Sequence, residues 1–197
     1  MRPRLAVLVT AAMLIAAACL YKATRTYQPV DPATVEQRCP VTKPLFFLLP
    51  DQHRPQRFVK LEAYLGRHRV LLVFYDRDAG AEGNPVLVRL RRDYERLEAA
   101  GVKVFGVSTA IPQENRPPIE GRPYRTDNQP REAFPFPLLT DVSPACAVHR
   151  QWGRFDAARS KPLPGVFLID RTGSVACSEG VPRPLADPPA TIDNLLR

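Results

Sequence analysis

The segment from Val70 to Ser108 constrains the fold of this chain more than any other part of the sequence. Residues 70–75 are an uninterrupted apolar run of mostly β-forming types, which indicates a strand covered on both faces. After a short glycine-bearing loop, Asn84 and Pro85 suit an N-cap and a first helical position. Residues 102–108, VKVFGVS, are expected to form a second buried strand. The segment therefore predicts a βαβ unit with parallel strands and a right-handed crossover.

A single amphipathic helix is expected between Asn84 and Gly101, because glycine suits the position just after a helix end. Its apolar residues recur at helical spacing and predict one buried stripe, with arginines on a solvent-exposed face. The stripe consists of Leu87, Leu90, Tyr94 and Leu97, and the arginines are Arg89, Arg92 and Arg96.

The flanking sequence predicts the remaining elements. Extended segments are expected at residues 45–49 and 58–61, a short helix at 143–153, and an antiparallel hairpin of two strands within 166–178. The proline-rich stretch 111–134 predicts only turns or a short helical piece. The hairpin is expected to be the last ordered element. This order predicts an α/β thioredoxin-like fold, with a central mixed β-sheet flanked by helices.

The N-terminus predicts export. A basic start is followed by an uncharged apolar stretch, Leu5–Tyr21, at the lower length limit for a membrane span. Residues 1–21 are therefore expected to be a signal-anchor or signal peptide, with retention, cleavage and lipidation at Cys19 all open. Residues 22–41 are interpreted as a linker and 42–197 as the folded domain. The domain is placed outside the cytoplasm, tethered to the membrane through this segment.

The positive charge of the chain does not indicate a nucleic-acid partner. The net charge is +8, from 28 lysines and arginines against 20 acidic residues. These basic residues are scattered and are not interleaved with aromatic residues, as a nucleic-acid surface requires. No phosphate-binding loop or Ser-His-Asp set is present, and no cofactor is expected.

Three cysteines remain after Cys19 is set aside: Cys39 just before the domain, and Cys146 and Cys177 within it. In an oxidising compartment an odd number predicts one disulfide and one free thiol, or three free thiols. Cys39 and Cys177 are each possible structural disulfide partners, and Cys177 is also a redox candidate. The spacing does not determine the connectivity.

Cys146 is the strongest candidate for a reactive thiol. With Ser143 as the N-cap, it is expected at the third helical position, where the helix dipole favours a thiolate. His149 follows one turn later on the same face, and a Cys–His pair is a plausible nucleophile. The alternative is a buried structural cysteine near Trp152.

Several stretches together resemble the alkyl hydroperoxide reductase C and thiol-specific antioxidant (peroxiredoxin) family. They are PLFFLLPDQHRPQRFVKLEAYLGRHRVLLVFY, YERLEAAGVKVFGVST, FPFPLLTD and PGVFLIDRTGSV, and they run from Pro44 to Val175. The sequence is also similar to membrane-anchored thiol–disulfide oxidoreductases with the redoxin fold. The resemblance implies an antioxidant or thiol-dependent oxidoreductase.

The positions that carry the family's chemistry hold other residues here. The resemblance places the peroxidatic cysteine at Gly83, the preceding hydroxyl residue at Gly80 and the peroxide-polarising arginine at Pro164. A thioredoxin-type C-x-x-C pair would fall at Ala79 and Glu82. Peroxide reduction needs a thiolate and a nearby cation, and these residues supply neither.

Pro164 also matches the proline, usually cis, that faces the active site in thioredoxin-like oxidoreductases. The alternative is an ordinary turn into a strand.

The other polar residues predict no metal site. The copper-delivery relatives of this fold use a C-x-x-x-C pair and a histidine, whereas this chain lacks the pair and its histidines (His53, His68 and His149) are scattered. The loop acids Asp76, Asp78 and Glu82 are expected to form a polar cluster that stabilises the helix start.

Two functional classes follow. The chain is either a thiol-dependent oxidoreductase that uses a non-standard thiol, with Cys146 as the first candidate, or a catalytically inactive binding or structural module at the membrane. The substrate, the partner and the oligomeric state are not encoded in any motif.

Overall fold

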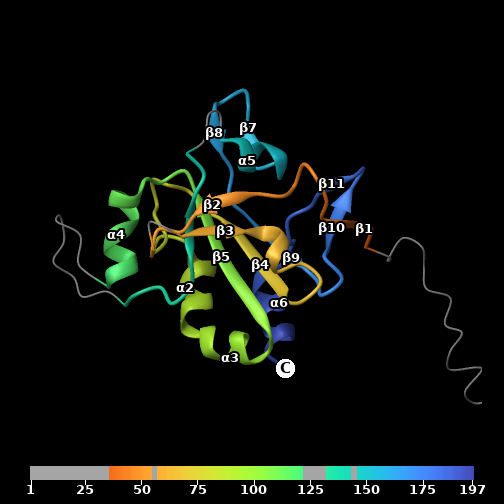
Figure 1. The fold of residues 1–197 in the computed structure, drawn as a ribbon, viewed down its shortest axis with the longest axis horizontal. Helices are drawn as coiled ribbons and strands as arrows, with labels where there is room; N and C mark the ends of the chain where they lie inside the picture. Colours follow the sequence, from red (N-terminus) through yellow and green to blue (C-terminus); the bar gives the residue numbers. More distant parts are fainter. Residues whose placement is uncertain (1–35, 55–56, 122–131, 143–145) are drawn as a thin grey trace, which may run out of the picture. The chain divides into compact units, whose positions relative to one another are not determined.

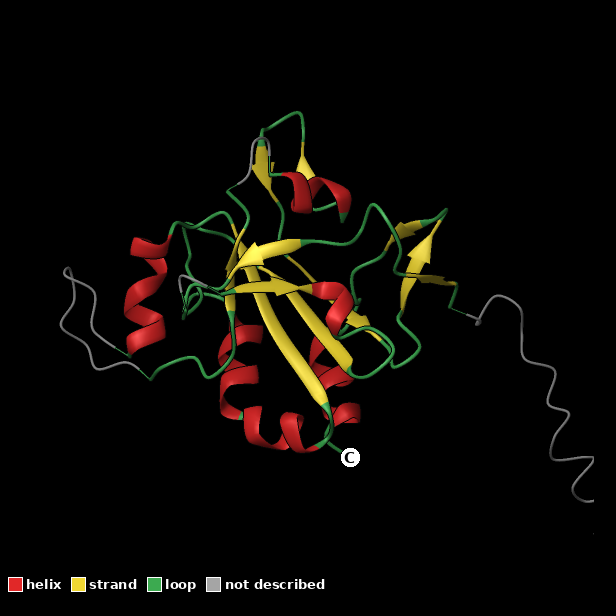
Figure 2. Ribbon diagram, in the orientation of Figure 1, coloured by secondary structure: helices red, strands yellow, loops and turns green. Residues whose placement is uncertain are grey.

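The fold is built around a seven-stranded mixed sheet, seen in a computed structural model that describes residues 36–54, 57–121, 132–142 and 146–197. The strand order is β1-β10-β9-β4-β5-β6, with β11 paired to β10 (Figures 1 and 2). The strands are β1 (Arg38–Pro40), β4 (Arg69–Phe74), β5 (Val102–Ser108), β6 (Leu138–Thr140), β9 (Gly165–Ile169), β10 (Ser174–Ser178) and β11 (Val181–Pro182).

The centre of the sheet confirms the expected βαβ unit. Strands β4 and β5 are parallel, with Arg69 opposite Val102 and Phe74 opposite Val107. Strand β6 is parallel to β5, whereas β9 is antiparallel to β4. The β9–β10 hairpin is antiparallel as predicted. The carboxyl ends of β4, β5 and β6 therefore meet at one edge of the sheet, where parallel α/β sheets commonly bind ligands.

The prediction of a single helix after β4 is wrong, because two short helices occupy its place. Helix α2 (Pro85–Arg92) and helix α3 (Tyr94–Ala99) meet at Asp93, whose backbone (φ −96°, ψ 10°) leaves helical geometry. The Asp93 carboxylate accepts hydrogen bonds from Arg89 and Arg92. Of the three arginines expected to face solvent, Arg92 and Arg96 are exposed and Arg89 is partly buried.

Both faces of the sheet are covered, as the uninterrupted apolar run in β4 predicts. Along this strand Val70, Leu72 and Phe74 enter one core cluster, and Leu71 and Val73 enter the other. Helices α2, α3 and α6 (Pro188–Leu195) cover the second face and lie together in Figure 1. The first face is covered by helix α5 (Ala147–Gln151) and the hairpin of β2 (Leu48–Pro50) and β3 (Phe58–Lys60).

The remaining elements are small. They are the 3₁₀ helix η2 (Leu61–Ala63), helix α4 (Pro112–Glu120) and the hairpin of β7 (Phe155–Asp156) and β8 (Lys161–Pro162). The hairpin of β9 and β10 is not the last ordered element, because β11 and α6 follow it. The sheet also begins at β1, inside the stretch interpreted as a linker.

The segment interpreted as a signal-anchor, residues 1–21, lies outside the described residues. Among the residues that the structure does describe, no helix combines the length and apolar character of a membrane span.

Candidate functional site

The candidate site is the loop of turns, residues 77–83, that joins β4 to α2 at the carboxyl edge of the sheet. Its acidic residues are tied to neighbouring chain segments. The Asp76 carboxylate accepts the Asp78 backbone N–H at 2.9 Å and pairs with Lys161 at 3.1 Å. The Asp78 hydrogen bond, and then Lys161, lower the pKa of Asp76 despite its partial burial. Arg77 pairs with Glu114 of α4.

The start of helix α2 is capped by an amide and not by the loop acids. The Asn84 side-chain oxygen accepts the backbone N–H groups of Val86 and Leu87, each at 3.0 Å. This confirms the predicted N-cap. The expected contribution of Asp76, Asp78 and Glu82 to the helix start, through the helix dipole, stays a prediction.

Gly83, the position where the resemblance places a cysteine, has no room for a side chain. A Cβ atom built on Gly83 would lie closer than 3.0 Å to the backbone carbonyl oxygen of Ala79. Gly83 is not among the glycines with positive φ, so steric exclusion and not backbone conformation makes glycine necessary here. Gly80 differs, because its φ of 68° lies in the left-handed region that favours glycine.

Cys146 does not occupy the third helical position, so that prediction is wrong. It is the residue before α5, in a left-handed conformation with φ 50° and ψ 58°, and Ser143, the expected cap, lies outside the described residues. Its thiol is free and partly buried. Burial and the nearby Asp141 carboxylate raise the pKa of the Cys146 thiol. The site therefore favours the thiol over the thiolate.

His149 is held by Asp141, and no hydrogen bond joins its ring to Cys146 among the described residues, so the Cys146–His149 pair stays a prediction. The imidazole Nδ1 lies 2.7 Å from an Asp141 carboxylate oxygen, which also accepts the His149 backbone N–H at 2.9 Å. Both side chains are fully buried, and the ring packs edge-on against Phe74 at 5.0 Å between centroids. Nε2 has no hydrogen-bond partner among the described residues.

The other two cysteines of the domain form a disulfide. Cys39 of β1 is bonded to Cys177 of β10, across 138 residues of sequence. This confirms one of the expected alternatives, a single disulfide with Cys146 as the free thiol. Cys177 is therefore not a free redox residue, contrary to its place among the candidates.

Comparison with known proteins decides the family. Residues 43–178 match the AhpC/TSA family. The chain belongs to this family. Its curated relatives include alkyl hydroperoxide reductase E from Mycobacterium tuberculosis and from Mycobacterium bovis, each 29% identical over 133 residues, which is 68% of this chain and 79% of the relative.

Solved structures of AhpC/TSA-type proteins share the fold. The mitochondrial 2-Cys peroxiredoxin of Plasmodium falciparum matches with a TM-score of 0.55 and 17% identity, over 77% of this chain and 90% of that chain. Peroxidoxin BcpB of Mycobacterium tuberculosis matches with a TM-score of 0.54 and 22% identity, over 82% and 94%. At these identities the likeness concerns the fold, and it confirms the predicted thioredoxin-like α/β architecture.

Sequence reasoning missed an arginine beside Pro164. Arg154, which follows α5, donates from Nη1 to the Pro164 carbonyl oxygen at 3.3 Å and from Nε to the Gly153 carbonyl oxygen at 2.8 Å. Gly165 makes room for this side chain, because a Cβ atom there would lie closer than 3.0 Å to Arg154 Cδ. Burial lowers the pKa of Arg154, and no carboxylate of the described residues pairs with it.

Pro164 itself does not have the cis geometry that the thioredoxin-type comparison suggested. In the part of the chain that the structure describes, the cis peptide bond is Lys43–Pro44. Pro164 enters β9 from the β7–β8 hairpin, which fits the alternative reading of an ordinary turn into a strand.

The histidines remain separate in the fold. His53 Nε2 donates to the Phe134 carbonyl oxygen (2.9 Å), His149 is held by Asp141, and His68 packs near Tyr64. No group of three or more potential metal ligands occurs among the described residues.

Proposed function

We propose that this AhpC/TSA-family chain is a peroxiredoxin-like protein that has lost the ordinary peroxidase reaction and acts as a binding module. The observation that carries the proposal is that neither Gly83 nor Cys146 supplies a reactive thiolate. The loop position at Gly83 has neither sulfur nor space for a side chain. The free thiol of the described domain, Cys146, has a raised pKa and a neighbouring carboxylate.

The physical reason is the need for a thiolate. Peroxide is attacked by the ionised form of cysteine, which active sites favour with helix N-termini or nearby cations. Cys146 has the reverse environment, because Asp141 disfavours a second negative charge. His149 does not offset this effect in the structure, because its Nε2 has no hydrogen-bond partner among the described residues and so makes no hydrogen bond to the Cys146 thiol.

The competing function is a thiol-dependent oxidoreductase that uses Cys146. Family membership supports it, as does the position of Cys146 beside the buried Asp141–His149 pair. Arg154 would supply a cation near Pro164, where the family's arginine is expected, although no thiol of the described residues accompanies it in the loop.

Steady-state assays separate the two functions. The full chain and a Cys146→Ser variant should be assayed for hydrogen peroxide consumption and for reduction of insulin disulfides, with dithiothreitol or thioredoxin as the reductant. The proposal predicts that neither protein exceeds the rate of the reductant alone. A rate that depends on protein concentration and disappears in Cys146→Ser would establish the oxidoreductase.

We also propose that the domain is exported and tethered through its N-terminal segment. The uncharged stretch Leu5–Tyr21 motivates the tether, and the Cys39–Cys177 disulfide is the kind of bond that persists in oxidising compartments. Alkaline phosphatase fused after Arg197 should then be active in bacterial cells, because this reporter folds only outside the cytoplasm. An inactive fusion, paired with a fluorescent green fluorescent protein fusion, would contradict export.

A further inference from the structure

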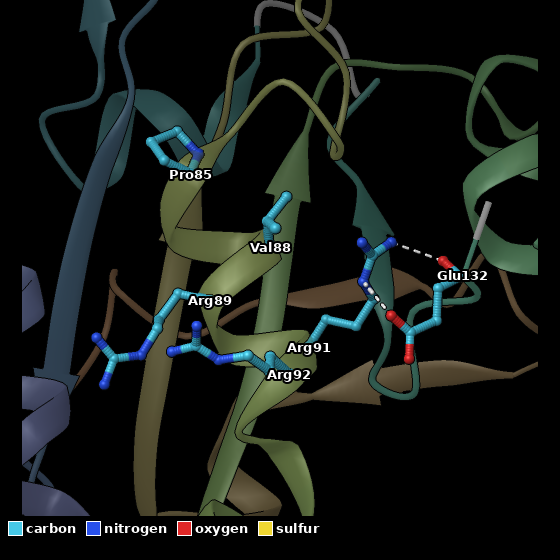
Figure 3. Close-up of a pocket in the computed structure, with 6 residues that line it drawn as sticks. All are labelled: Pro85, Val88, Arg89, Arg91, Arg92 and Glu132. Atoms are coloured by element: carbon cyan, nitrogen blue, oxygen red, sulfur yellow. Dashed lines mark hydrogen bonds and ion pairs between the residues drawn. The ribbon is translucent and has the colours of Figure 1, made fainter. Parts of the chain in front are cut away.

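An open groove runs along the outer face of helix α2, starting two residues after Gly83. It has a volume of about 340 Å³ and is lined by Pro85, Val88, Arg89, Arg91, Arg92 and Glu132. Figure 3 shows the arginine side chains spread along the helix and Glu132 facing Arg91 from the opposite wall. The groove thus combines guanidinium groups with two apolar side chains from the first turn of the helix.

The arginines of the groove differ in how fully they are engaged. Arg89 pairs with Asp93 and, at 2.6 Å, with Asp193 of α6. The Arg91 side chain is only 16% exposed, and its guanidinium lies 4.7 Å from the centroid of the Phe134 ring. The Arg92 side chain is 70% exposed and reaches only Asp93, at 3.3 and 3.5 Å. Because Asp93 is shared with Arg89, Arg92 keeps donor groups directed to solvent.

Glu132 shows how this groove receives a carboxylate. Its side-chain oxygen lies 3.6 Å from Arg91 Nε, while its backbone carbonyl accepts a hydrogen bond from Arg91 Nη1 at 2.6 Å. The side chain is 77% exposed, so the ion pair is solvated and contributes little to stability. The backbone contact holds the segment in place, whereas the carboxylate is free to be replaced by another one.

We propose that this groove binds an acidic segment of a partner protein. A glutamate or aspartate of the partner takes the place of the Glu132 carboxylate at Arg91 and also uses the free donors of Arg92. Guanidinium groups suit this role because their planar donors match a carboxylate. An apolar residue beside that acidic residue packs on Val88 and Pro85. This inference rests on the proposed binding function and names the chemistry of the partner.

The charges of the groove favour a peptide over a polyanionic surface. The groove is lined by three guanidinium groups and the Glu132 carboxylate, and Asp93 and Asp193 pair with Arg89 and Arg92 beside it. A phospholipid surface or a nucleic acid brings a dense array of negative charge, which those three carboxylates repel. A single carboxylate that replaces Glu132 adds no such repulsion.

Fluorescence anisotropy tests the inference on the full chain, purified in a mild non-ionic detergent. The probe is a fluorescein-labelled peptide with adjacent glutamates flanked by leucines, and the control peptide carries lysines in place of the glutamates. Arg92→Ala should weaken binding of the glutamate peptide about fivefold, and Glu132→Ala should strengthen it about threefold, because each change alters an exposed ion pair. Arg67→Ala, an exposed arginine outside the groove, is the matched control and should bind like the wild type.

The gain expected for Glu132→Ala keeps the test informative, since a misfolded variant does not bind more tightly. Equal binding of the two peptides, or affinities unchanged by Arg92→Ala and Glu132→Ala, would overturn the inference. Binding to phosphatidylglycerol vesicles without binding to the glutamate peptide would overturn it too, in favour of a membrane-facing groove. The peroxidase assays are independent of these results, so failure of the groove and failure of the proposed function are distinguishable.

Discussion

Single residues determine what the loop after β4 is able to do. At Gly83 the Ala79 carbonyl oxygen fills the space that a side chain would need, and at Gly165 the missing side chain admits Arg154. The family resemblance predicts a cysteine at the position of Gly83, but it does not reveal that the Ala79 backbone occupies the space beside it. Arg154 was missed because it is ten residues from Pro164 and its contact with that carbonyl depends on the β7–β8 hairpin.

A cysteine introduced at position 83 should destabilise the fold. Gly83→Cys should lower the free energy of unfolding by about 1–3 kcal/mol, the usual range for inserting atoms into filled space. Gly83→Ala is the matched control and should cost a similar amount, because the clash involves Cβ. Urea unfolding followed by circular dichroism measures both. A Gly83→Cys variant as stable as the wild type would show that the loop still accepts a side chain.

Cys146 should titrate as a hindered thiol. Its iodoacetamide alkylation rate, followed by mass spectrometry across pH, should have its midpoint above that of the same thiol in urea-unfolded protein, because burial and Asp141 raise the pKa. The folded state then binds the proton more tightly than the unfolded state. This contribution to stability is present below the unfolded thiol pKa, about 8.5, and is lost as the pH rises through the folded value. An alkylation midpoint at lower pH in the native than in the unfolded protein would contradict a raised pKa for the Cys146 thiol.

Elements differ in how far local sequence predicts them. Strands β4 and β5, the start of α2 and the β9–β10 hairpin carry their own signals, namely apolar runs, an N-cap with proline and a tight turn. The break at Asp93 was not predicted because the apolar stripe continues through it. Strand β1 pairs with β10 across most of the domain, so it has no local pattern that identifies it. Helix α6 has the same start signal as α2, an N-cap at Asp187 followed by proline, and the prediction overlooked it.

Strand β1 is joined to β10 by strand pairing and by the Cys39–Cys177 disulfide. Cys39→Ser should lower the free energy of unfolding by about 2–5 kcal/mol, the usual cost of removing a native disulfide. The free energy of unfolding of the wild-type protein in reductant should fall to the same value. Cys146→Ser under non-reducing conditions should keep the free energy of unfolding of the oxidised wild type. Guanidinium unfolding curves of the three samples measure this. Equal stability of Cys39→Ser and the oxidised wild type would mean that the Cys39–Cys177 disulfide does not stabilise the domain.

At the scale of the whole molecule, many acidic residues form ion pairs with surface arginines. A hydrogen bond from the Asp78 backbone is the main cause that lowers the pKa of Asp76. A hydrogen bond from Arg77 is the main cause that lowers the pKa of Glu114. At Asp93 and Asp170 burial acts in the opposite direction, but hydrogen bonds outweigh it and the pKa is again lowered. The pairs connect elements that are distant in sequence, including α2 with α6.

These shifts predict the acid response of the domain. A carboxyl group whose folded pKa lies below its unfolded value, about 4, stabilises the fold above that value and stops doing so as the pH falls through the folded pKa. The urea midpoint should therefore be nearly constant from pH 7 to about 5 and decline steadily below about 4. A midpoint unchanged between pH 5 and pH 3 would show that these carboxylates titrate alike in both states.

The central claim is that this AhpC/TSA-family domain has no peroxidatic thiol. Its most direct test is the second-order rate constant for oxidation of Cys146 by hydrogen peroxide at neutral pH, measured by dimedone trapping of the sulfenic acid and mass spectrometry. We predict a rate constant no higher than that of the same cysteine in a short unfolded peptide, increasing with pH as the thiol ionises. A rate constant far above the peptide value and independent of pH above 7 would contradict the account.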